Sequence, residues 1–231
     1  MSQVLTVLGP GIYPDVMLLR PPGVYRAEND TEILTDVMLR GGYATGRDVL
    51  DVGTGSGALA VAAAHAGARR VTAVDLSRRS VLATWLNSRL HRAPVRVRRG
   101  DLFAPVAGNR YGLVVTNPPY VPAETAVLPR HRKARCWDAG PDGRALLDRI
   151  CRSVTGVLAP GGHVLLVHSA VCDADLTVET LNEEGLTAQI LTRATIPFGP
   201  VMRSRAALLE ARGLIRPGQT FEELVVVGAS A

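Results

Sequence analysis

The feature that most constrains the fold is a regular alternation of short apolar runs with helical patterns, which begins at Asp48 and continues almost to the end of the chain. Strands that alternate with helices of about 10–15 residues are typical of βαβ units and a parallel sheet. The sequence therefore predicts a doubly wound α/β fold. Strands are expected at residues 48–52, 71–74, 95–97, 111–116, 164–168, 188–192 and 224–227. Helices are expected at residues 31–40, 58–66, 81–90, 144–158, 176–184 and 204–212.

The helical patterns also predict which side chains are buried and where helices end. Trp85 lies on the apolar face of the helix at 81–90, so we expect it in the core. Pro160-Gly161-Gly162 is expected to break the chain between the helix at 144–158 and the strand that follows it.

Two segments fall outside the alternation. Residues 1–44 contain four prolines before the first predicted helix, and we expect this arm and helix to cover the functional site. Residues 199–220 lie between the last two predicted strands and form an insertion in a domain that spans residues 45–231. Both segments are candidates for covering the carboxyl edge of the sheet, where open α/β sheets bind their ligands.

Composition narrows the class of protein. The chain has 231 residues, of which 47% are hydrophobic and 20% are charged, enough apolar side chain for one globular core. No apolar run reaches the ~18 residues of a membrane span, and no basic region precedes an apolar stretch at the N-terminus, so we expect a cytoplasmic protein without membrane contact. The three cysteines show no metal-ligand spacing, which argues against a disulfide framework and against a metal site.

The net charge is +5, and Lys133 is the single lysine among 26 basic residues. Two clusters of basic residues are present: Arg89, Arg92, Arg96, Arg98 and Arg99, followed by Arg130, Arg132, Lys133 and Arg135. Such clusters either form solvated faces or attract an acidic partner or nucleic acid. A nucleic-acid partner therefore stays open, although it is not favoured.

A glycine-rich loop, Asp51-Val52-Gly53-Thr54-Gly55-Ser56-Gly57, directly follows the first predicted strand. Gly53 and Gly55 permit a tight turn, and the start of the next helix offers free N–H groups to an anionic group. Asp75 ends the second strand, 22 residues after Gly53, where a carboxylate can accept both hydroxyls of a ribose. The loop predicts a nucleotide-like ligand. Since Gly53, Gly55 and Ala58 also satisfy the G-x-G-x-x-A dinucleotide pattern, NAD is a rival ligand.

Gly100-Asp101-Leu102-Phe103 follows the third predicted strand. The Asp101 carboxylate can accept a hydrogen bond from the exocyclic amine of an adenine, with Phe103 beside the ring. The alternative is an ordinary turn residue. Together with the chemistry of the next loop, this segment shifts the balance away from NAD.

Asn117-Pro118-Pro119-Tyr120 (NPPY) lies at the carboxyl end of the fourth predicted strand. A planar NH2 nitrogen is a poor nucleophile because its lone pair is delocalised. The side-chain oxygen of Asn117 and the carbonyl of Pro118 can each accept one N–H, so that fixed dipoles already meet the charge that develops as the nitrogen attacks a methyl sulfonium. The prolines preset the carbonyl directions, and Tyr120 can pack against the planar group. The motif predicts Asn117, Pro118 and Tyr120 as catalytic residues.

These motifs resemble class I S-adenosylmethionine-dependent methyltransferases and, more closely, the HemK/PrmC family, which methylates the side-chain amide of a glutamine in translation release factors. The resemblance runs from about Val24 to Asp148 and more loosely to Val227, with support from Val24-Tyr25, Asp30-Thr31-Glu32 and residues 137–144. It implies a Rossmann-like methyltransferase fold, with a mostly parallel seven-stranded sheet whose last strand is antiparallel. It also implies S-adenosylmethionine as the cofactor.

The resemblance assigns roles to individual residues. Asp75 would bind the ribose, Asp101 the adenine, and Gly53 with Gly55 the methionine moiety. The full set implied for the cofactor is Asp51, Gly53, Thr54, Gly55, Gly57, Asp75, Leu76, Asp101, Leu102 and Asn117. The set implied for the acceptor amide is Asn117, Pro118, Pro119 and Tyr120.

Only about 45 residues precede the first predicted strand, so the chain resembles the short archaeal and eukaryotic branch of the family, whose members work with a small zinc-binding activator protein. We therefore predict an N-methyltransferase acting on a glutamine amide of a protein such as a release factor, with an activator as a candidate partner. The alternatives are an N-methyltransferase of a nucleic-acid base or small molecule, a non-catalytic cofactor-binding partner subunit, and an NAD oxidoreductase.

Overall fold

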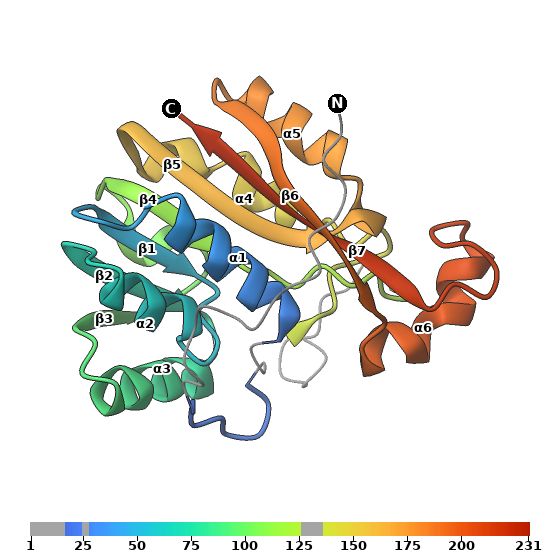
Figure 1. Ribbon diagram of the computed structural model, residues 1–231, viewed down its shortest axis with the longest axis horizontal. Coiled ribbons are helices and arrows are strands. Elements are labelled where there is room, and N and C mark those ends of the chain that lie inside the picture. Colours follow the sequence, from blue (N-terminus) through green and yellow to red (C-terminus); the bar gives the residue numbers. More distant parts are fainter. Residues whose placement is uncertain (1–16, 25–27, 126–135) are drawn as a thin grey trace.

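The computed structural model describes residues 17–24, 28–125 and 136–231, so the second basic cluster and most of the N-terminal arm lie outside the described residues. The described part of the chain contains a seven-stranded sheet with the order β3-β2-β1-β4-β5-β7-β6 (Figure 1). Its strands are β1 (Asp48–Val52), β2 (Arg70–Asp75), β3 (Val95–Arg99), β4 (Tyr111–Thr116), β5 (Leu158–Ser169), β6 (Thr187–Pro197) and β7 (Phe221–Ser230).

The strand directions confirm the predicted fold class. β1 to β5 pair in parallel, and β7 is antiparallel to both of its neighbours, β5 and β6. The order changes direction at β1 and β4, which lie next to each other although two strands separate them in sequence. Open α/β sheets bind ligands at such a switch point, outside the carboxyl ends of the strands.

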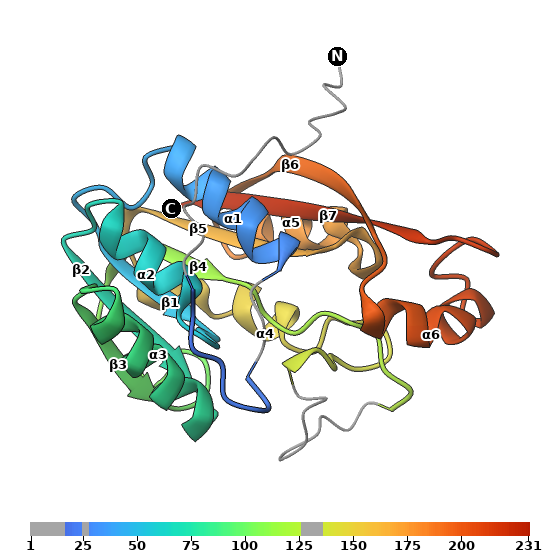
Figure 2. The same ribbon diagram turned by 60° about the horizontal axis from the view of Figure 1, so that its bottom comes forward.

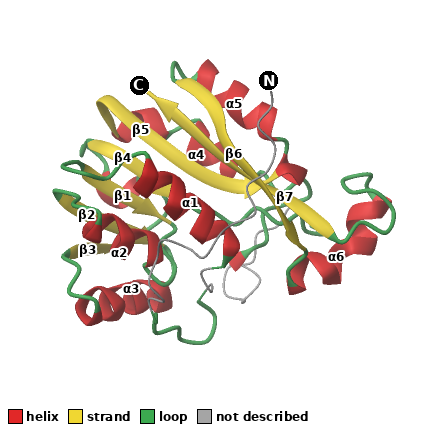
Figure 3. Ribbon diagram, viewed as in Figure 1, coloured by secondary structure: helices red, strands yellow, loops and turns green. Residues whose placement is uncertain are grey.

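Helices cover both faces of the sheet (Figures 1 and 3). One face carries α1 (Asn29–Arg40), α2 (Ala58–His65) and α3 (Arg78–Leu90), and the other carries α4 (Leu147–Cys151) and α5 (Ala174–Glu183). Each face has its own apolar core, with Leu34 and Met38 of α1 on the first and Leu147 and Leu181 on the second. α6 (Pro200–Ala211) follows the end of β6 and lies apart from the other helices, as the turned view in Figure 2 shows.

The segment between β4 and β5 differs from its prediction. The helix expected at 144–158 is reduced to α4 and a 3-10 turn at Val154–Val157, and β5 begins at Leu158 and runs through Pro160-Gly161-Gly162. The pairing of β4 with β5 shifts register between Tyr111 and Leu113, so an irregularity in the ladder accommodates the proline and glycines. Five of its apolar residues are buried nonetheless, because the short helix and the turn keep them on the core side: Leu147, Ile150, Val154, Val157 and Leu158. Leu146 is partly exposed and lines the cleft.

α3 forms as predicted, but the face that it turns to the core is not the expected one. Trp85 is 46% exposed, so its predicted place in the core is wrong. The buried face instead carries the small or polar side chains of Ala83, Thr84, Asn87 and Ser88. The reason is the close approach of the glycine-rich loop, because a Cβ on Gly57 would lie 2.9 Å from Thr84 Cγ2. A bulky side chain on this face would push α3 away from the loop.

Predictions about membrane contact, the insertion and the domain boundary compare with the structure as follows. None of the helices in residues 17–24, 28–125 and 136–231 is long and apolar enough to cross a membrane. The predicted insertion at 199–220 contains α6, which begins at Pro200 rather than at the expected Ser204 because proline is well suited to the first turn of a helix. The division into an arm at 1–44 and a domain at 45–231 stays a prediction.

Candidate active site

A cleft of about 1370 Å³ opens at the carboxyl ends of β1, β2 and β4. It has two halves, which we call the cofactor half and the acceptor half. The cofactor half is lined by Gly53–Ser56, Asp75, Leu76, Asp101 and Leu102. The acceptor half is lined by Asn117–Val121, Trp137, Ile196 and the start of α6, with Asp30 and Thr31 at its edge. The cleft thus brings together every predicted site residue except Asp51 and Gly57, which are not among its lining residues.

The cofactor half is organised by Asp75 at the end of β2. Its Oδ2 accepts a hydrogen bond of 3.0 Å from the backbone N–H of Gly55, and its Oδ1 accepts one of 2.7 Å from Ser77. Gly53 is held in turn by the carbonyl of Val74, at 2.9 Å. Gly53 and Gly55 have φ of 73° and 57°, which glycine adopts without steric cost. The loop therefore stands against the end of β2 with its backbone facing the cleft.

Asp51 lies beneath this loop instead of in the cleft. Its Oδ2 accepts hydrogen bonds from Thr54 Oγ1 at 2.6 Å and from the backbone N–H of Ala60 at 3.1 Å. The side chain is fully buried, and burial raises the pKa of Asp51 to about 7. Asp51 therefore ties the turn to the first turn of α2, a role in positioning the loop.

Asp101 stands at the rim of the cleft, after β3. Its Oδ2 forms an ion pair of 2.5 Å with Arg149 of α4, and both side chains are about half exposed. The next residue, Leu102, has a φ of 43°, an uncommon conformation for a leucine, and its side chain packs against the core on the α4 face. The ion pair with Arg149 orients the Asp101 carboxylate, and this pairing was not predicted from the sequence.

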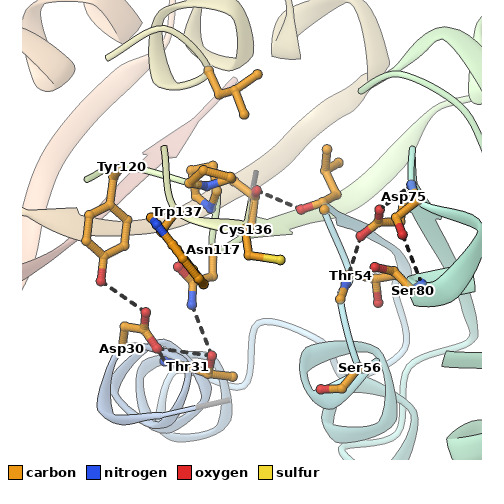
Figure 4. Close-up of a pocket in the computed structure, with 18 of the residues that line it drawn as sticks. Asp30, Thr31, Thr54, Ser56, Asp75, Ser80, Asn117, Tyr120, Cys136 and Trp137 are labelled. Atoms are coloured by element: carbon orange, nitrogen blue, oxygen red, sulfur yellow. Dashed lines mark hydrogen bonds between the residues drawn. The ribbon is translucent and has the colours of Figure 1, made fainter. Parts of the chain in front are cut away.

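The NPPY segment is held by the N-terminal turn of α1 (Figure 4). Asn117 Nδ2 donates to Thr31 Oγ1 at 3.0 Å, and Tyr120 Oη donates to Asp30 Oδ2 at 3.0 Å. The other carboxylate oxygen of Asp30 accepts from the backbone N–H of Thr31 at 2.6 Å and from its hydroxyl at 3.3 Å. Asp30 and Thr31 thus connect Asn117 to Tyr120 through a continuous chain of hydrogen bonds.

This chain of hydrogen bonds determines which end of the Asn117 amide is left for a ligand in the cleft. The amide nitrogen is used by Thr31, whose hydroxyl both accepts from Asn117 and donates to Asp30. Within the part of the chain that the structure describes, no group donates a hydrogen bond to Asn117 Oδ1. The oxygen is therefore the end of the amide that is left to accept a hydrogen bond from a ligand.

Sequence reasoning did not assign the roles of Asp30 and Thr31. Both belong to a segment that supported the family resemblance, and the start of α1 was predicted beside them. What the sequence lacked was the contact itself, because Thr31 and Asn117 are 86 positions apart. An acidic residue and a hydroxyl residue at the start of a helix that covers a cleft are the signal that points to such a role.

α6 closes the far end of the acceptor half. Met202 and Leu209 pack with Val121 and Phe198 in a small apolar cluster. Arg205 forms an ion pair with Asp138 and donates to the carbonyl of Pro122 at 2.7 Å, so α6 is attached to the segment that follows NPPY.

The charges of the two halves differ. The cationic side chains that line the described cleft, Arg78, Arg79, Arg99 and Arg149, belong to the cofactor half. The acceptor half carries the acidic side chains of Asp30, Asp138 and Glu222, of which Asp138 is paired with Arg205 behind the lining. The described acceptor half is therefore apolar and acidic.

Comparison with known proteins bears on the chemistry of this cleft. A family model described as a methyltransferase small domain matches residues 15–130, which include the glycine-rich loop, Asp75, Asp101 and the NPPY segment. The chain belongs to this methyltransferase family. Membership confirms the predicted resemblance and makes the protein an enzyme of the methyltransferase class.

Two curated relatives of this methyltransferase are named for glutamine. One, from Methanocaldococcus jannaschii, is provisionally named a protein N5-glutamine methyltransferase and is 28% identical over 181 residues, with 78% of this chain and 90% of the relative covered. The other, from Bordetella pertussis, is named a release factor glutamine methyltransferase and is 38% identical over 163 residues, with 67% of this chain and 57% of the relative covered. The chain spans between 39% and 59% of the length of the bacterial relatives it matches.

Among solved structures, the methyltransferase is similar to the Mtq2–Trm112 complex of E. cuniculi, described as responsible for the methylation of the eRF1 translation termination factor. The TM-score is 0.63 at 22% identity, with 90% of this chain and 98% of that chain covered. At this identity the likeness speaks for the fold alone. It confirms the Rossmann-like methyltransferase fold that the resemblance implied.

Proposed function

We propose that this methyltransferase transfers the methyl group of S-adenosylmethionine to the side-chain amide nitrogen of a glutamine in a protein, such as a translation release factor. The observation that carries the proposal is the orientation of Asn117, whose Nδ2 is bound to Thr31 so that Oδ1 is left for the acceptor. The names of the two curated relatives support glutamine as the acceptor residue.

The cofactor half fits S-adenosylmethionine. A Cβ built on Gly53 would have no atom within 4 Å, so the loop leaves open space for a ligand beside its backbone. Asp75 lines this space and would bind the ribose, while Asp101 would accept from the adenine amine and Gly53 with Gly55 would hold the methionine moiety. Leu76 and Leu102 also line this half and would contact the adenosine. When bound, S-adenosylmethionine supplies an electrophilic methyl group on a positively charged sulfur.

The residues of the acceptor half act by positioning. Asn117 Oδ1 and the carbonyl of Pro118 each accept one N–H of the glutamine amide, which turns the nitrogen lone pair toward the methyl group. Pro119 keeps the turn rigid, and Tyr120 is held for packing by its bond to Asp30. With the donor bound, the nitrogen would bond to the methyl carbon as the carbon–sulfur bond breaks, and the thioether would leave with that electron pair. The positively charged nitrogen would then release one proton to water, so no strong base would have to act before the attack.

The charges of the cleft favour a protein acceptor over a nucleic-acid base. A nucleic acid brings phosphates, which are bound by lysine and arginine side chains. The described acceptor half is lined by acidic side chains, and the arginines of β3, Arg96, Arg98 and Arg99, lie on the strand at the edge of the sheet, beyond β2 and β1. An uncharged amide therefore fits the acceptor half better than a base in a polyanion.

Two finer proposals follow from the same assignment. Release factors act in the cytoplasm, so we place the enzyme there. The likeness to the Mtq2–Trm112 complex supports a small activator protein as a partner of this chain as well.

The test is label transfer to separated protein, RNA and metabolite pools, with purified release factor as a defined acceptor. We expect labelled protein that releases labelled methylamine on acid hydrolysis, the product of an N-methylated glutamine amide. Asn117→Ala should lower kcat by about 100- to 1,000-fold, because an acceptor oxygen for the reacting nitrogen is lost, and should leave the Kd for S-adenosylmethionine within threefold. Label in RNA alone, or preserved turnover with strongly reduced cofactor affinity in the variant, would contradict the proposal.

A further inference from the structure

Glu222 stands at the acceptor end of the cleft with no assigned role. It lies near the start of β7, opposite Ile196 of β6, and both side chains line the cleft. Since directly opposed residues of an antiparallel pair project from the same face of the sheet, Glu222 and Ile196 form one surface. Glu222 is 5% exposed and forms no ion pair with a cation among the described residues, which is unusual for a buried glutamate.

The hydrogen bonding of Glu222 is incomplete. Oε2 is buried and has no hydrogen-bond partner among the residues that the structure describes. The groups that face this carboxyl are the Ser169 side chain of β5, which hydrogen-bonds to it, and the Asp30 carboxylate of α1, which repels it. Burial raises the pKa of Glu222 to about 7, and Asp30 adds to this increase.

A buried oxygen without a partner is destabilising, and native proteins keep such groups where a ligand completes the bonding. The terminal torsion of a glutamate is soft, so the carboxyl can turn an oxygen toward a donor that enters the cleft. The described groups around it supply no donor to Oε2, so the donor comes from what enters the cleft, either water or a ligand in the acceptor half.

The surface around Glu222 is apolar. After Ile196 the chain passes through Pro197 and enters α6, where Val201 and Met202 also line the cleft. Arg205 fixes this wall in place, because it joins α6 to Asp138 and to the carbonyl of Pro122, two residues after NPPY. Among the described residues, the acceptor end therefore offers an apolar wall on which Glu222 Oε2 is an acceptor oxygen without a hydrogen-bond partner.

We propose that Glu222, Ile196, Val201 and Met202 form a subsite for the peptide segment next to the methylated glutamine, and that an oxygen of Glu222 accepts a hydrogen bond from a backbone N–H of that segment. The inference rests on the proposed function, since it takes the acceptor to be a protein. The subsite selects an uncharged flanking residue. Acidic residues are rejected, because Glu222 and Asp30 already place two carboxyl groups there.

The test compares Glu222→Met, which keeps the length of the side chain without its oxygens, with Glu222→Gln, which keeps an acceptor oxygen. With release factor as the acceptor at pH 8, we expect Glu222→Met to raise the KM for the acceptor about tenfold. Its kcat at saturation and its Kd for S-adenosylmethionine should stay within threefold of wild type, and Glu222→Gln should raise the KM less than threefold. Glu223→Gln is the matched control, because the neighbouring Glu223 is partly exposed and pairs with Arg193 instead.

A second readout separates binding from a structural role. A carboxyl retained for binding is poorly satisfied in the free enzyme, so Glu222→Met should keep or raise the Tm at pH 8, where the carboxyl is ionised. An acceptor KM within twofold of wild type in Glu222→Met would overturn the proposal, as would a lower Tm together with weaker cofactor binding. These outcomes are distinguishable from a wrong proposed function. If the proposed function were wrong, the wild-type enzyme would neither label release factor nor bind it in a direct titration.

Discussion

Removing the hydroxyl of Thr31 tests whether α1 prepares the active site for catalysis. Thr31→Val keeps the shape of the side chain and the backbone N–H that Asp30 accepts, but it removes the acceptor for Asn117 Nδ2 at 3.0 Å and the donor to Asp30 at 3.3 Å. The hydrogen bond between the neutral side chains of Asn117 and Thr31 contributes about 1 kcal/mol, and the longer one contributes about as much because its acceptor is a carboxylate. A loss of about 2 kcal/mol in the transition state corresponds to a kcat about 30-fold lower.

The assay is steady-state methylation of release factor at saturating donor and acceptor, with donor affinity measured by calorimetry. We expect the loss in kcat while the Kd for S-adenosylmethionine stays within twofold, because Thr31 contacts Asn117 and not the glycine-rich loop. Thr31→Ser, which keeps the hydroxyl, should recover most of the activity. Thr35→Val is the control, a buried threonine one turn further along α1. A kcat within twofold of wild type, or an equal loss in the control, would refute the reasoning.

Two further predictions concern stability, each measured by urea unfolding. Because burial raises the pKa of Asp51 to about 7, its protonated form contributes stability that is complete below the unfolded pKa of 3.8 and is lost as the pH rises through 7. Between pH 5 and pH 8 the free energy of unfolding of the ligand-free enzyme should fall by about 3 kcal/mol through this group. Asp51→Asn should remove that part of the pH dependence, and parallel pH profiles of variant and wild type would count against this reasoning. Arg205→Met should lower the free energy of unfolding by about 2 kcal/mol, because Asp138 is left partly buried without its partner. Adding Asp138→Asn to this variant should restore about half of the lost stability. If the effects of the two substitutions simply add, Arg205 and Asp138 are not coupled and the reasoning is wrong.

The parts of the fold that follow from local pattern were predictable. The strands that lead to the site, β1, β2 and β4, were expected within one residue of their observed ends. Apolar runs of this length, bounded by glycine and proline, carry their own signal because a buried strand needs no distant residue to be recognised. The loops after these strands were predictable for the same reason, and they brought Gly53, Asp75 and Asn117 to one cleft.

Prediction failed where packing between distant segments overrides local pattern. The apolar stripe of α3 indicated a buried Trp85, but the helix turns its small side chains to the glycine-rich loop because the loop approaches closely at Gly57. The helix expected at 144–158 is shortened because β5 extends back to Leu158 to pair with Tyr111 of β4. In both places a contact between distant segments decides the local structure, and the spacing of apolar residues in the sequence carries no information about that contact.

The sequence by itself therefore determined the fold class, the glycine-rich loop and the residues of the acceptor motif, since each is written in a short stretch of neighbouring residues. Tertiary structure alone decided how these residues are held: Asn117 is oriented by Thr31, Tyr120 is anchored by Asp30, and Glu222 is buried without a full set of partners. These arrangements depend on hydrogen bonds between segments 86 and 90 positions apart. Such bonds have no local signature, because their geometry exists only after the sheet and its helices have packed.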